Sequence, residues 1–142
     1  MWLITKIGFF SVVQKPQDVA GGMLTIRSRV RGDLESLNKI MTGLGPIEEG
    51  KGTDYRYRAR ASKQDVAATF SGMIAELDYQ NFKDEVKATQ GKPRAEIYGD
   101  VWEVLYGLTA DANPKPKVAV TKSKADPVLI PRPPQTMSES SR

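Results

Sequence analysis

The chain has 142 residues, 39% of them hydrophobic and 27% charged, which suits a single globular domain with its own core. It contains no cysteine and no histidine, which excludes disulfides, thiol nucleophiles, the usual zinc sites and an imidazole general base. The formal net charge is +4, but residues 1–112 carry 15 Lys and Arg against 15 Asp and Glu, whereas residues 113–142 carry six against two.

The first part of the chain predicts strands followed by a helix. Residues 2–14 are rich in β-branched and aromatic side chains around Gly8, so we expect one long bent strand or a tight hairpin. Residues 15–22 have the composition of a loop, and residues 23–30 alternate cleanly as a strand. A helix is expected to begin at Gly32 and Asp33, because four apolar side chains follow at helical spacing: Leu34, Leu37, Ile40 and Met41.

Residues 55–61 form the clearest predicted strand, after a Gly-rich acidic loop at 46–53. One face of this strand is expected to carry Tyr55, Tyr57, Ala59 and Ala61, and the other face three arginines. Ser62 has the position of an N-cap for a second helix, whose apolar stripe is Val66, Phe70, Met73 and Leu77.

Two shorter helical patterns follow. Asn81 is expected to cap a third helix, and Pro93 suits the first turn of a last one. The apolar face of the last helix consists of Ile97, Val101, Leu105 and Leu108, widened by Tyr98 and Trp102. We expect this face to pack against the body.

These elements predict an α+β fold with an antiparallel sheet covered by helices on one face, in the style of a ferredoxin-like plait. We expect a single domain over residues 1–111 and a disordered basic tail rich in Pro, Lys and Ser over residues 112–142. The apolar N-terminus is shorter than a membrane span and is interrupted by Lys6 and Gly8. It is therefore interpreted as a strand, and a cytoplasmic protein without a membrane partner is expected.

Two arginine ladders at strand spacing are the most distinctive feature of the sequence. They consist of Arg27, Arg29 and Arg31, and of Arg56, Arg58 and Arg60. If the two strands are neighbours, up to six guanidinium groups lie on one open sheet face. Guanidinium binds phosphate and carboxylate in a bidentate manner and stacks on bases. The ladders therefore predict an anion-binding face.

The plainer interpretation is a solvated surface on which the arginines pair with acids such as Glu48 and Glu49. The neutral charge of residues 1–112 favours this interpretation. Directly opposed arginines would nevertheless repel each other, which requires something anionic among them.

Other clusters carry weaker signals. Asp78, Asp84 and Glu85 could hold a hard cation or act as acid and base, but their position also suits a capped helix start, and no recognised spacing supports a metal site. Tyr98 to Trp102 is interpreted as core packing around Gly99. In the tail, residues 131–134 have the form of a short polyproline ligand.

Five stretches occur together in this chain: MWLxTxxGFFSVVQ, IRSRVRxDLE, DYRYR, DYxNFK and YGDVW. In this combination the chain resembles a family of small bacterial cytosolic proteins of unknown function. The resemblance covers about residues 1–108 and leaves the tail outside. It implies a bacterial cytosolic protein and brings no activity, cofactor or catalytic residue with it.

The sequence therefore predicts a non-catalytic binding protein without a cofactor or metal, which uses its arginine-lined face for an anionic partner. RNA or single-stranded DNA is the favoured partner. The first alternative is a protein interaction module, or a homodimer, that docks an acidic partner. The second is an enzyme that uses Asp78, Asp84 or Asp100 together with a lysine or tyrosine.

Overall fold

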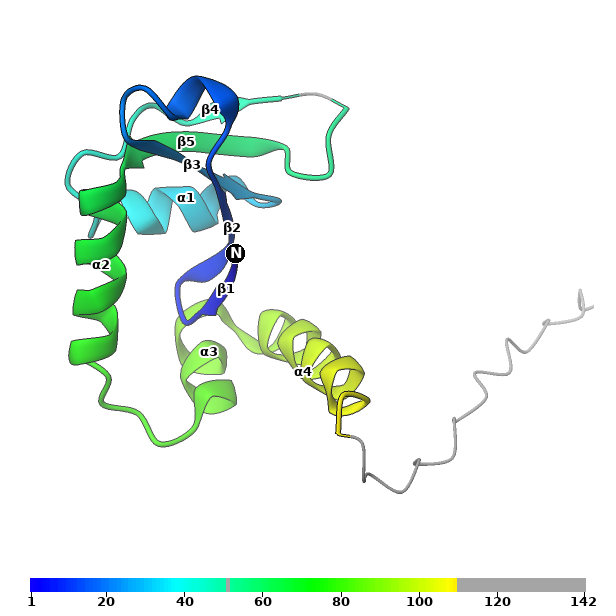
Figure 1. The fold of residues 1–142 in the computed structure, drawn as a ribbon. Coiled ribbons are helices and arrows are strands. Elements are labelled where there is room, and N and C mark those ends of the chain that lie inside the picture. The colour runs from blue at the N-terminus through cyan, green and yellow to red at the C-terminus, as the bar shows by residue number, and fades with distance from the viewer. Residues whose placement is uncertain (51, 110–142) are drawn as a thin grey trace, which may run out of the picture. The chain divides into compact units, whose positions relative to one another are not determined.

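The computed structural model describes residues 1–50 and 52–109 (Figure 1). Its strands are β1 (Trp2–Thr5), β2 (Gly8–Val13), β3 (Met23–Ser28), β4 (Glu48–Glu49) and β5 (Tyr57–Ser62). Its helices are α1 (Arg31–Asn38), α2 (Lys63–Ala75), α3 (Phe82–Gln90) and α4 (Lys92–Tyr106), with a short 3-10 helix η1 (Pro16–Asp18). The predicted tail lies outside the described residues.

The five strands form one sheet in the order β1-β2-β3-β5-β4, and every neighbouring pair is antiparallel. This confirms the α+β class and resolves the N-terminal alternatives as a tight hairpin, in which Thr5 pairs with Gly8. The order does not confirm a ferredoxin-like plait, which follows the pattern β-α-β-β-α-β, because β1, β2 and β3 follow one another directly as neighbours in the sheet and no α-helix joins them. Within the same residues, no helix is long and apolar enough to cross a membrane.

The main core lies between one face of the sheet and helices α1 and α2. Phe10 and Ile26 from the central strands are fully buried against Leu34 and Leu37 of α1. The stripe predicted for the second helix also packs here through Val66 and Phe70. Its last member, Leu77, is exposed, and so is Ile40 of the first stripe, because α1 ends at Asn38. This cluster stabilises α1 and α2, because a helix in a protein gains most of its stability from packing its apolar face.

Helices α3 and α4 pack on the opposite face, at the β1–β2 hairpin. Side chains alternate along a strand, so Phe9 points away from the core that holds Phe10. Phe9 and Ile4 pack against a second cluster formed by Val86, Ala95 and Tyr98. The expectation of helices on one face therefore holds for α1 and α2, while the α3–α4 pair covers part of the other face.

A buried carboxylate joins both layers at this point. Asp33, at the start of α1, accepts hydrogen bonds from the Phe9 main-chain N–H at 3.0 Å and from Ser28 Oγ at 3.2 Å. Arg94 of α4 completes the arrangement with a bidentate contact at 2.8 and 3.1 Å. Gly8 makes room for it, because a Cβ on Gly8 would lie 2.6 Å from the Asp33 Cβ.

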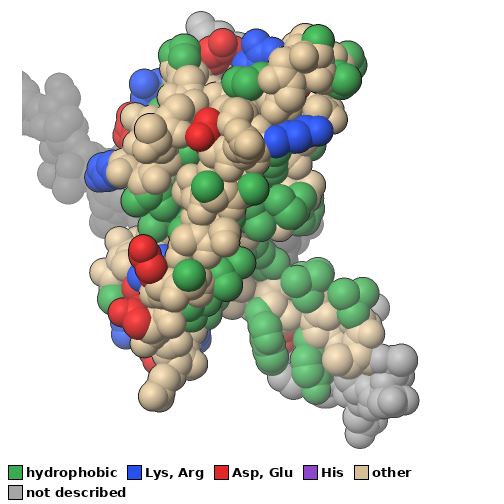
Figure 2. All heavy atoms as spheres, turned by 60° about the vertical axis from the view of Figure 1, so that its left-hand side comes forward, with side chains coloured by type: hydrophobic (Ala, Val, Ile, Leu, Met, Phe, Trp, Pro, Cys, Tyr) green, Lys and Arg blue, Asp and Glu red, His purple; other side chains and the backbone are tan. Residues whose placement is uncertain are grey.

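The far end of α4 does not pack as expected. Ala95 and Tyr98 are buried, but Trp102 and Leu105 remain 61% and 52% exposed. In Figure 2, hydrophobic side chains gather on the surface of α4. The predicted close packing at Gly99 is also wrong, since a Cβ there would meet nothing within 4 Å. Helical periodicity identified an apolar face but not the surface that would cover it.

Candidate anion-binding site

The strand register brings the two ladders together. Arg27 of β3 lies directly opposite Arg58 of β5, and Thr25 lies opposite Arg60. Because Ile26 points into the core, its neighbours Thr25 and Arg27 point to the other face of the sheet. The adjacency on which the anion-binding prediction depended is therefore present.

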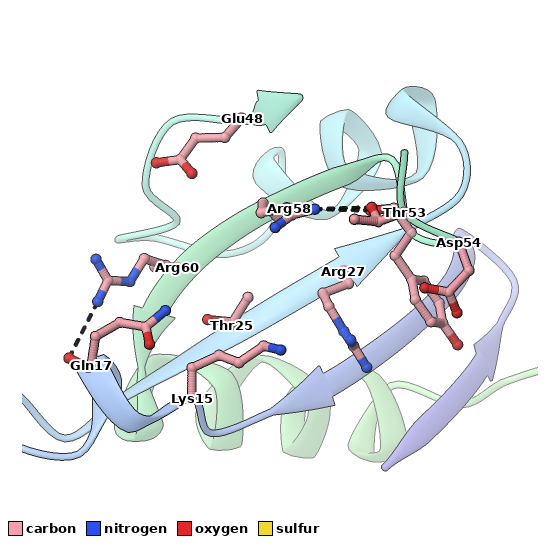
Figure 3. Close-up of a pocket in the computed structure, with 10 residues that line it drawn as sticks. Lys15, Gln17, Thr25, Arg27, Glu48, Thr53, Asp54, Arg58 and Arg60 are labelled. Carbon is pink, nitrogen blue, oxygen red and sulfur yellow. Dashed lines mark hydrogen bonds between the residues drawn. The ribbon is translucent and has the colours of Figure 1, made fainter. Parts of the chain in front are cut away.

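These side chains surround a pocket of about 260 Å³ (Figure 3). Its lining consists of Lys15, Gln17, Thr25, Arg27, Glu48, Thr53, Asp54, Tyr55, Arg58 and Arg60. Four of these residues are cationic and two are acidic. The pocket is polar and its excess charge is positive, which suits an anionic group better than an apolar ligand.

Arg27 is held from two sides. Its Nη2 donates a hydrogen bond to Ser11 Oγ at 2.7 Å, and its guanidinium carbon lies 4.5 Å from the centre of the Tyr55 ring. Its Nε is buried and has no hydrogen-bond partner. A buried donor without a partner is costly, and Arg27 forms no ion pair with the described residues that would offset this cost.

Arg58 is held by the loop that precedes β5. Its Nη2 donates to Thr53 Oγ1 at 3.0 Å and to the Tyr55 carbonyl at 3.4 Å, and its Nε is likewise buried without a partner. Gly50 makes this placement possible, because a Cβ there would collide with the guanidinium. The two arginines with unpartnered Nε groups are thus the pair that faces each other across β3 and β5.

Arg60 differs from Arg27 and Arg58, because it forms an ion pair with a carboxylate. The buried Asp18 of η1 accepts hydrogen bonds from Arg60 Nε at 2.9 Å and from Thr25 Oγ1 at 2.6 Å. Burial opposes the ionisation of Asp18, but the hydrogen bonds from Thr25, Lys15 N–H and Arg60 together hold its pKa below the ordinary value of 3.8. Asp18 therefore anchors η1 to the sheet as an ionised carboxylate.

The other three ladder arginines lie outside the pocket lining. Arg31 falls in the first turn of α1 and pairs with Glu35 at 2.9 Å. Arg56 precedes β5 and pairs with Glu49 at 2.6 Å, as the plainer interpretation expected for that acid. Arg29 follows β3, and its guanidinium carbon lies 5.4 Å from the Tyr55 ring centre. The ladders break because both strands are shorter than the alternating pattern.

Tyr55 is the largest departure from the predicted site. The pattern placed it on the core face of its strand, but β5 begins only at Tyr57. Its ring instead contacts Phe9 on the arginine face and is buried beneath Arg27 and Arg29. Sequence reasoning also missed Lys15, Gln17 and Thr53, since loop residues carry no periodic signal that would place them beside a strand.

The acidic cluster after α2 forms a helix start. Asn81 Oδ1 accepts hydrogen bonds from the N–H groups of Lys83 and Asp84, which confirms it as the cap of α3. Asp78, Asp84 and Asp100 are exposed. Among residues 1–50 and 52–109, no group of three or more acidic side chains is placed to hold a metal ion.

Comparison with known proteins adds no further constraint, because no family model, curated protein or solved structure matches the chain. The resemblance to the bacterial family stays a prediction.

Proposed function

We propose that this chain is a binding protein that takes phosphate groups of single-stranded nucleic acid, RNA or DNA, into the pocket between β3 and β5. The observation that carries the proposal is the cross-strand pair Arg27 and Arg58. Each has a buried Nε without a partner, and neither forms an ion pair among the described residues.

Electrostatics supports an anionic occupant. Two like charges directly opposite each other on a sheet destabilise it, and an anion between them removes that repulsion. Lys15 adds positive charge to the pocket lining, which also contains the acidic Glu48 and Asp54, whereas the charge of Arg60 is paired with Asp18. A phosphate oxygen accepts two guanidinium hydrogen bonds at once, which matches the paired donors.

The arrangement supports contact with the backbone rather than with bases. Tyr55, the aromatic residue of the pocket, is 4% exposed and lies beneath guanidinium groups, so its face is closed to stacking. Binding is then expected to depend little on sequence and strongly on salt. A single strand is favoured because a pocket of about 260 Å³ admits one flexible phosphodiester group more readily than a duplex.

The test is fluorescence anisotropy of labelled single-stranded oligonucleotides over a salt series, with the full chain. Arg27→Gln/Arg58→Gln is expected to lose on the order of a hundredfold in affinity, since hydrogen bonds to charged groups contribute about 1.5–3 kcal/mol each. The matched control is Arg31→Gln/Arg56→Gln, which removes the same charge from arginines already paired with acids. Both variants keep the basic residues of 113–142, so their difference reports on the pocket.

Three outcomes would contradict the proposal. The wild-type chain does not bind, or the two double variants lose affinity equally, or an acidic peptide displaces the oligonucleotide at lower concentration than unlabelled nucleic acid does. The last result would identify a carboxylate-rich protein as the partner of the same pocket. The nucleic-acid proposal would be supported by nucleic acid that copurifies with the wild type and is absent from Arg27→Gln/Arg58→Gln.

A further inference from the structure

The two edges of the sheet differ in a way that the pocket does not explain. The β4 edge is only two residues long and both are acidic, Glu48 and Glu49. Short, charged edges are how monomeric proteins prevent pairing with other strands. The β1 edge reads Trp2-Leu3-Ile4-Thr5 and has no charge and no proline. By the same rule this edge is unprotected.

The hydrogen bonds of the hairpin show which groups β1 leaves open. Met1 and Val12 exchange both main-chain hydrogen bonds, at 2.8 and 2.9 Å. Bonded and non-bonded pairs alternate along an antiparallel ladder, so the N–H and C=O groups of Trp2 and Ile4 point away from β2. In the described part of the chain these outward groups have no hydrogen-bond partner.

A groove runs beside this edge. A cavity of about 230 Å³ is lined by β1 and by the end of α2, including Phe70, Met73 and Ile74. Ile74 and Leu77 are 70% and 51% exposed, and Trp2 on the edge itself is 69% exposed. A strand added to β1 would find apolar side chains of α2 beside it.

We propose that the chain forms a homodimer by antiparallel pairing of β1 with β1 of a second copy. The register places Leu3 opposite the partner's Leu3, and Trp2 opposite the partner's Ile4. Each Trp2 and Ile4 then exchanges two main-chain hydrogen bonds across the interface, which satisfies every outward group identified above. The five-stranded sheet of one copy continues into that of the other.

A second copy suits this edge better than an arbitrary strand, because β1 is complementary to itself. Trp2 and Ile4 lie on the same sheet face, so the proposed register makes an aromatic and β-branched pair twice, and such cross-strand pairs are favourable. The contact uses the same patch on both copies and therefore closes at two. The proposal does not depend on the arginine pocket, which lies on β3 and β5.

The experiment uses the absence of native cysteine. In the proposed register the two Leu3 residues form a non-hydrogen-bonded pair with Cα atoms about 4.5 Å apart, which is within disulfide range. Leu3→Cys in the full chain is expected to form a covalent dimer on mild oxidation. The matched control is Val19→Cys, at a 60% exposed residue directly after η1 and outside β1. This variant should stay monomeric on gels.

Sedimentation supplies the second arm. Trp2→Pro removes an outward N–H without touching the β1–β2 ladder, whereas Trp2→Thr keeps that N–H. The dimer of Trp2→Pro should dissociate at a concentration on the order of tenfold or more above that of Trp2→Thr, since one hydrogen bond is lost from each copy. Circular dichroism checks that both variants fold.

The proposal is overturned if the wild type sediments as a monomer at all concentrations, or if Leu3→Cys crosslinks no faster than Val19→Cys. It is also overturned if Trp2→Pro and Trp2→Thr dimerise equally, which would place the interface elsewhere, for example on the exposed end of α4. If Trp2→Pro fails to fold, the crosslinking arm decides alone.

Discussion

Arginine occurs in two contrasting settings in this molecule. Near the β1–β2 hairpin, Arg94 closes on the buried Asp33 with two hydrogen bonds and joins α4 to the sheet. Between β3 and β5, Arg27 and Arg58 face each other, and no carboxylate of residues 1–50 or 52–109 pairs with either. The first setting is complete within the fold, whereas the second leaves buried donors unused.

The difference separates charges that stabilise the fold from charges available for binding. Removing one member of a buried ion pair leaves the other uncompensated and is costly. Removing one of two opposed cations relieves repulsion and leaves no carboxylate without its partner. The two settings should therefore respond to substitution in opposite ways.

The largest expected effect is at the ion pair of Arg94 and Asp33. Arg94→Leu should lower the free energy of unfolding by about 3 kcal/mol, because Asp33 is 4% exposed and would lose the one cation that pairs with it among the described residues. Urea denaturation followed by tryptophan fluorescence measures the change. Arg94→Lys should recover part of the loss, and a loss below about 1 kcal/mol for Arg94→Leu would show that the pair does not hold the two layers together.

The next effect concerns Asp18 and depends on pH. Because the folded-state pKa of Asp18 lies below its ordinary value of 3.8, its ionised form stabilises the fold above about pH 4. That contribution is lost as the pH falls through the lower folded-state pKa. Asp18→Asn should therefore cost about 1–2 kcal/mol at pH 7 and show a weaker dependence of stability on pH below about pH 4. Parallel dependence in both proteins would contradict this.

A smaller effect is expected where Gly50 makes room for Arg58. Gly50→Ala places a methyl group against the guanidinium, which is the flexible end of a side chain and can move aside. Oligonucleotide affinity should fall several-fold, roughly 1 kcal/mol, while the unfolding midpoint changes little. Gly99→Ala, whose Cβ would meet nothing within 4 Å, is the control and should leave affinity unchanged.

The smallest effect on stability is predicted for the facing arginines, Arg27 and Arg58. Arg58→Met keeps the side-chain stem over the sheet and removes one of the opposed charges, so the free energy of unfolding should stay within about 0.5 kcal/mol of wild type or rise. Thermal and urea unfolding measure it. A loss as large as that of Arg94→Leu would show that Arg58 is a structural residue and would remove the contrast between the two regions.

Local patterns sufficed for most elements. Alternation identified β3 and β5, and the spacing of Leu34 and Leu37 identified α1. Caps were readable as well: Ser62 Oγ accepts from the Asp65 N–H at 3.0 Å, as its position predicted. These features depend on neighbours within one or two turns, which the sequence lists directly.

The candidate site was only partly predictable, and the reason lies in strand length. Arg27, Arg58 and Arg60 line the pocket as the ladders suggested, but Arg29, Arg31 and Arg56 fall beyond the ends of β3 and β5. Where a strand ends, the alternation that assigns side chains to faces ends too. Tyr55 crossed to the arginine face for the same reason.

The sequence by itself determined the class of the fold, the arginine-rich strands and the lack of thiol and imidazole chemistry, since composition and short-range periodicity carry that information. Only the tertiary structure decided that β3 and β5 are neighbours, that Asp18 and Asp33 each capture an arginine, and that Arg27 and Arg58 remain open. These outcomes join residues up to 61 positions apart. Partners at that separation are chosen by packing and by the satisfaction of buried charge, which no local pattern encodes.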